Sequence, residues 1–106
     1  MFCRDQLVEL RESYDKIKKI DAEVIAISTE KPIDIKRTIE ALGFQYPVLY
    51  DTASAVPRLY GVDQDGTAIP STFVLDKSGK IRWTYIATED HDQPSMAQII
   101  EQLEAL

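Results

Sequence analysis

The stretch at residues 69–81 constrains the fold of this chain more than any other. Residues 71–76 are β-branched and aromatic in the middle, and their apolar side chains follow one another without alternating, which is typical of a strand buried on both faces. The sequence Asp-Lys-Ser-Gly at 76–79 supplies turn residues, so the strand should return as a hairpin over 80–87. Pro70 cannot donate a backbone hydrogen bond, so it belongs at the entry of the strand.

Helical periodicity is clearest over residues 2–20, where apolar side chains recur every three or four positions. The near-continuous apolar run at 22–28 has the length of a buried strand. Next we expect a helix capped by Ser28 or Thr29 and ended by Gly43, an edge strand at 46–50, and a short helix capped by Asp51 and ended by Gly61. A loop at 62–68, the hairpin and an acidic connector at 88–94 should follow. The last helix should begin with a capping box of Ser95 and Gln98, and its Ile99, Leu103 and Leu106 should face inward.

This order of elements predicts one α/β domain over residues 1–106, with helices on both faces of a sheet. A chain of 106 residues is too short for two cores. A helix followed by a buried parallel-type strand normally has a strand before it as well, whereas here the helix comes first. We therefore expect the domain to be incomplete at its N-terminus, through truncation or a misassigned start.

Charge and cysteine content exclude several classes of function. The net charge of −6 argues against binding nucleic acid, and no apolar run approaches the roughly 20 residues that span a bilayer. A single cysteine, Cys3, forbids an internal disulfide and favours a reducing, cytoplasmic location. His91 has no second histidine or cysteine at ligand spacing, and the residues at 63–66 lack the spacing of a calcium loop. We expect no metal and no cofactor.

Several motifs together resemble the thioredoxin-fold redoxins. They are Phe-Cys-Arg-x-Gln-Leu-x-x-Leu at 2–10, Glu-Val-Ile-Ala-Ile-Ser at 23–28, Tyr-Gly-Val at 60–62, Ile-Pro-Ser-Thr-Phe-Val-Leu-Asp at 69–76 and Gly-Lys-Ile at 79–81. The resemblance covers nearly the whole chain and is greatest to the alkyl hydroperoxide reductase/thiol-specific antioxidant (AhpC/TSA) group, which is peroxiredoxin-like. It implies a thioredoxin-like fold with a mixed central sheet flanked by helices, whose N-terminal strand is missing from this chain.

The resemblance also implies a site. Cys3 matches the redox cysteine at the start of the first helix, and Pro70 matches the proline that faces this cysteine, so the Ile69–Pro70 bond is expected to be cis. Ile69, Pro70 and Arg4 would contact the substrate. From the residues alone, a lone cysteine is more often a small hydrophobic residue, and an X-Pro bond is cis in only about 5–6% of cases. A helix N-terminus and the charge of Arg4 would both stabilise a thiolate at Cys3.

The function implied is a thiol-dependent oxidoreductase acting through Cys3 on disulfides or peroxides. The thiolate would form a mixed disulfide or a sulfenic acid. The reductant would be a small thiol or a thioredoxin-like protein, the substrate a peroxide or a protein disulfide, and a homodimer stays open. Typical peroxiredoxins carry an arginine near the position of Pro70 and this chain does not, which favours disulfide chemistry. The alternative is a non-catalytic thioredoxin-fold binding module, in which Cys3 would have an ordinary thiol pKa.

The missing strand leads to a prediction about the sheet. In the thioredoxin fold it lies between the strands that match residues 23–27 and 72–75. Buried backbone groups without partners cost about 1–3 kcal/mol each, and a typical domain is stable by only roughly 5–15 kcal/mol. We therefore expect these two strands to pair directly, or the gap to be filled by a strand from a partner or from a longer chain.

Overall fold

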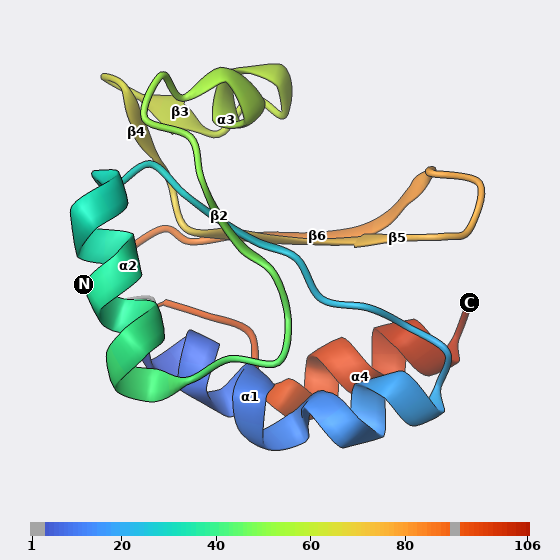
Figure 1. The fold of residues 1–106 in the computed structure, drawn as a ribbon. Coiled ribbons are helices and arrows are strands. Elements are labelled where there is room, and N and C mark those ends of the chain that lie inside the picture. Colours follow the sequence, from blue (N-terminus) through green and yellow to red (C-terminus); the bar gives the residue numbers. More distant parts are fainter. Residues whose placement is uncertain (1–3, 90–91) are drawn as a thin grey trace.

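A computed structural model of the chain describes residues 4–89 and 92–106, and its helices and strands alternate along the chain (Figure 1). Figure 1 shows α1 and α4 side by side beneath the strands, with α2 at one end of the molecule. The elements are α1 (Arg4–Lys19), β1 (Ala26–Ser28), α2 (Pro32–Leu42), β2 (Val48–Tyr50), α3 (Ala55–Leu59), β3 (Asp63–Gln64), β4 (Thr67–Ala68), β5 (Ser71–Leu75), β6 (Ile81–Ile86) and α4 (Met96–Glu104).

The first and last helices confirm the periodicity of the sequence. In α1, Asp5 lies in the first turn and three lysines in the last, which suits the helix dipole at both ends. Its Ile17 side chain is only 1% exposed. Helix α4 begins with the expected capping box, because the Ser95 hydroxyl accepts from the backbone of Gln98 and the Gln98 side chain accepts from the backbone of Ser95. Leu106 was expected to face inward but is 52% exposed.

The two middle helices end as predicted but begin differently. Gly43 follows α2 with a φ of +64°, a conformation that glycine adopts without strain, and its N–H donates to the carbonyl of Ile39. The prediction of a Ser28 or Thr29 cap was wrong: Lys31 occupies the N-cap, and no side chain caps this end. Asp51 is not at the N-cap of α3, yet its carboxylate accepts from the backbone N–H of Val56 at 2.8 Å.

The strands form three separate two-stranded sheets in the described part of the chain. β1 and β2 are parallel, with Ile27 opposite Leu49. β5 and β6 form the predicted antiparallel hairpin, with Phe73 opposite Thr84. Its turn is closed by Asp76, whose carboxylate accepts from the Ser78 N–H, the Ser78 hydroxyl and the Lys80 N–H.

The loop predicted at residues 62–68 is instead a small hairpin. β3 and β4 are antiparallel and are joined by Asp65 and Gly66, with φ angles of +52° and +81°. Two successive positive φ values give the turn that best matches the twist of the flanking strands, and Asp-Gly is one of the pairs that adopt it readily. The dipeptide was therefore a hairpin signal; the strands themselves are too short to show a period.

The prediction that the strands at 22–28 and 71–76 are buried was wrong. Ile25 and Ile27 are 62% and 42% exposed, and within β5 only Val74 is buried. β1 and β5 do not pair with each other either, since they belong to different sheets. Within the described residues each of these strands has a backbone partner on one edge only.

Side-chain contacts nevertheless hold the chain around β1 and the chain around β5 next to each other. Lys77, after β5, forms an ion pair with Asp21, before β1. At the other end Ala68, before β5, donates its N–H to the Thr29 hydroxyl, after β1, at 3.2 Å. The two segments therefore run antiparallel and are joined at both ends, with no backbone pairing between β1 and β5.

The buried core lies between the helices and these strands. Its apolar members are Ile17, Ile35, Tyr46, Val62, Val74 and Ile99. No helix in the described residues is both long and apolar enough to cross a membrane.

Candidate functional site

Pro70 connects the small β3–β4 hairpin to β5, and its surroundings are well paired. The Ile69 N–H donates to the carbonyl of Val62 at 2.7 Å, and the Pro70 carbonyl accepts from the Ala87 N–H at 2.9 Å. The Ser71 hydroxyl donates to the Ile69 carbonyl at 2.8 Å. The single backbone donor of this dipeptide is therefore occupied, and both residues are half-buried.

The expected cis bond at Ile69–Pro70 is wrong, because the described residues contain no cis peptide bond. The trans form of an X-Pro bond is favoured by about 0.5–1 kcal/mol in the absence of other constraints. The residues on the two sides of this bond are both hydrogen-bonded, Ile69 to Val62 and Pro70 to Ala87. The trans bond and both of these hydrogen bonds occur together in the structure.

The start of α1 lies against the start of β5. The Gln6 amide donates to the Thr72 hydroxyl at 3.1 Å. Sequence reasoning assigned Thr72 to packing and gave Gln6 no role. The sequence held a signal for this pair, since Gln6 follows Cys3 by three residues, the spacing of one face of the helix expected at 2–20, and Thr72 follows Pro70 by two, the spacing of one face of a strand.

Two of the predicted site residues belong to the N-terminus. Cys3 lies outside the described residues. Arg4 is the first residue of α1, and its side chain is outside the description too. Ile69 and Pro70 are described and lie together, as the sequence requires. The expectation that Cys3 faces Pro70 thus stays a prediction.

A groove of about 410 Å³ opens beside Pro70. This volume is within the range of roughly 300–1,000 Å³ that is usual for small-molecule sites. The lining residues come from the β3–β4 hairpin with the segment after it, and from the chain after β6: Gln64, Asp65, Thr67, Ala68, Ile69, Pro70, Ala87, Thr88 and Glu89. The groove therefore lies at the end of the β5–β6 hairpin that is opposite its turn, where the chain enters β5 and leaves β6.

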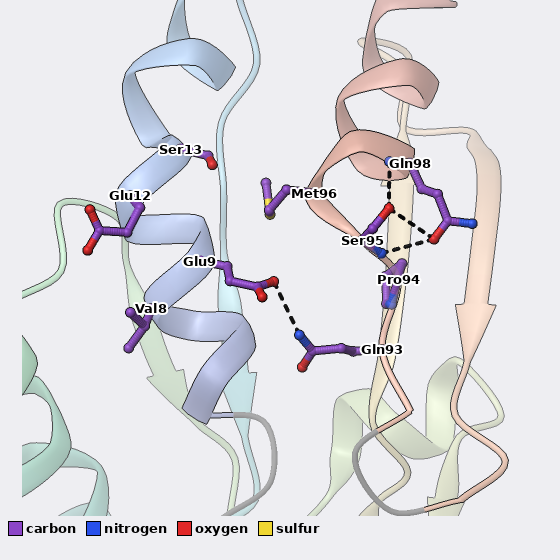
Figure 2. Close-up of a pocket in the computed structure, with 9 residues that line it drawn as sticks. All are labelled: Val8, Glu9, Glu12, Ser13, Gln93, Pro94, Ser95, Met96 and Gln98. Carbon is purple, nitrogen blue, oxygen red and sulfur yellow. Dashed lines mark hydrogen bonds between the residues drawn. The ribbon is translucent and has the colours of Figure 1, made fainter.

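A second groove, of about 520 Å³, lies between α1 and the start of α4 (Figure 2). Glu9 and Glu12 line it from α1, and Ser95 and Gln98 line it from the capping box. The Glu9 carboxylate accepts from the Gln93 amide across the groove at 3.2 Å. Its polar groups near α4 are used by the cap, and its lining contains no cysteine, so we do not place the thiol chemistry here.

The groups with displaced pKa values include Tyr46 and Asp76, and neither lines the groove beside Pro70. Burial raises the pKa of Tyr46 to about 12, and its hydroxyl donates to the carbonyl of Leu7 at 2.6 Å. Hydrogen bonds from Ser78 and Lys80 lower the pKa of Asp76 below its usual range. Within the described residues no three histidine, cysteine or acidic side chains are grouped to hold a metal ion.

Comparison with known sequences identifies relatives of two kinds. A chloroplastic peroxiredoxin Q from Gentiana triflora is 38% identical over 87 residues, which are 78% of this chain and 40% of the relative. A thiol-disulfide oxidoreductase ResA from Geobacillus thermodenitrificans is 27% identical over 81 residues, or 76% of this chain and 44% of that protein. The chain thus spans less than half the length of these curated relatives.

Solved structures confirm the fold. The AhpC of Enterococcus faecalis superposes with a TM-score of 0.81 at 24% identity, covering 99% of this chain and 66% of the other. A putative thiol:disulfide interchange protein DsbE from Chlorobium tepidum gives 0.74 at 24% identity, covering 95% and 70%. The fold is therefore thioredoxin-like, as expected. The AhpC/TSA family profile matches residues 1–84, which are well over half of this chain. This chain therefore belongs to the AhpC/TSA family.

Proposed function

We propose that this protein is a thiol-dependent oxidoreductase that acts through Cys3. The observation that supports this most directly is the hydrogen bond between Gln6 and Thr72. Three residues before Gln6 is Cys3, and two residues before Thr72 is Pro70. The contact ties the helix face that follows Cys3 to the strand face that follows Pro70, and family membership supplies the chemistry.

The proposed reaction begins with the thiolate, which a helix N-terminus stabilises through its unpaired N–H groups and dipole. Arg4, the next residue, would add positive charge. With a disulfide, the Cys3 sulfur attacks one sulfur, a mixed disulfide forms, and the other sulfur leaves as a thiolate that takes up a proton. With a peroxide, the O–O bond breaks, Cys3 becomes a sulfenic acid, and the leaving oxygen is protonated.

Cys3 is the only cysteine in these 106 residues, so the second thiol would come from residues outside this sequence, from another subunit or from a small thiol. A small thiol or a thioredoxin-like protein would fill this role. It would attack the mixed disulfide, or condense with the sulfenic acid and release water, and a second exchange would return Cys3 to the thiol. Disulfides are the favoured substrates because no described residue lining the Pro70 groove is an arginine that could assist a peroxide.

Whole-protein mass spectrometry tests this proposal, because with a single cysteine every mass change by thiol chemistry belongs to one site. The protein is treated with one equivalent of a small disulfide or of hydrogen peroxide, and Cys3→Ser is the control. We expect a mixed disulfide that a small thiol reverses, and a slower sulfenic acid with peroxide. A Cys3 that reacts no faster than in the urea-unfolded chain would leave the binding-module alternative.

A further inference from the structure

We draw no further inference here: the strongest candidate, the groove between α1 and the start of α4, carries nothing because its charged lining consists of the exposed carboxylates of Glu9 and Glu12, and nothing else in the described residues points to a ligand there.

Discussion

At the residue scale, the hydrogen bond between Gln6 and Thr72 connects two residues 66 positions apart. Gln6 lies in α1, three positions after Cys3 in the sequence, and Thr72 lies in β5, two positions after Pro70. The contact therefore joins the first turns of α1 to the start of β5.

A double-mutant cycle measures this contact. Gln6→Met and Thr72→Val remove one partner each and keep the size of the side chain. A hydrogen bond of this kind contributes about 0.5–1.5 kcal/mol, so we expect a coupling energy of this size in the free energy of unfolding by urea. Thr84, on β6, provides the control, since Gln6→Met with Thr84→Val should be additive. Additivity within about 0.3 kcal/mol for the Gln6–Thr72 pair would contradict the contact.

Tyr46 gives a pH-dependent prediction. Its pKa in the folded protein is about 12, raised from 10.0 chiefly by burial. The folded state thus prefers the neutral phenol, and this contribution to stability is fully present below pH 10 and is lost as the pH rises from 10 to about 12. A phenolate absorbance titration should contain a last component near pH 12 that Tyr46→Phe removes. If all five tyrosines ionise together near pH 10, the burial of Tyr46 is wrong.

At the element scale, β1 and β5 each have one open edge. In β1, the Ala26 N–H donates to Pro47 and the Ser28 carbonyl accepts from Asp51, so these residues direct their backbone groups toward β2. Backbone groups alternate along a strand, and Ile27 therefore directs its N–H to the other edge. By the same alternation in the β5–β6 register, the backbone N–H of Phe73 is directed away from β6, while the backbone N–H groups of Thr72 and Val74 are directed toward β6.

Amide hydrogen exchange tests this assignment residue by residue. In this chain we expect the amides of Ile27 and Phe73 to exchange much faster than those of Thr72 and Val74, which are paired with β6. The comparison is internal to one sample, because all four amides belong to the same two strands. Slow exchange at Ile27 and Phe73 would mean that the open edges are paired in solution.

The elements that the sequence predicted well are those with local signals. The capping box at Ser95 and Gln98, Gly43 after α2 and the turn at 76–79 each depend on a few adjacent residues. The prediction that 22–28 and 71–76 are buried failed because burial depends on which distant segments cover each face, and apolar residues such as Ile25 do not report that. The prediction of a cis bond was wrong because it came from the resemblance alone, whereas an X-Pro bond without other constraints is usually trans.

At the scale of the whole molecule, the two open edges belong to segments that run antiparallel and are joined at Asp21–Lys77 and Thr29–Ala68. A strand placed between them would run parallel to one segment and antiparallel to the other. The candidate site was predictable only in part for a similar reason. Pro70 and Cys3 are recognisable by motif, whereas Gln6 and Thr72 come together only through the three-dimensional packing.

We therefore expect a chain extended before Met1 by a strand of about five apolar residues to be more stable. Four or more new backbone hydrogen bonds at about 0.5–1.5 kcal/mol each would raise the free energy of unfolding by at least about 2 kcal/mol. The amides of Ile27 and Phe73 should become protected in the same protein. An extension of equal length with polar residues and glycine is the control, and equal stability of the two extended chains would contradict the strand-accepting gap.

The reactivity of Cys3 is the most direct test of the proposed chemistry. The measurement is the rate of alkylation by iodoacetamide as a function of pH, in this chain and in the strand-extended chain. A thiol at a helix N-terminus beside Arg4 should show a midpoint in the range of roughly 3.5–7.5, with turnover weak in this chain and higher in the extended one. A midpoint near about 8.5 in both chains, as for a free cysteine, would contradict a redox role for Cys3.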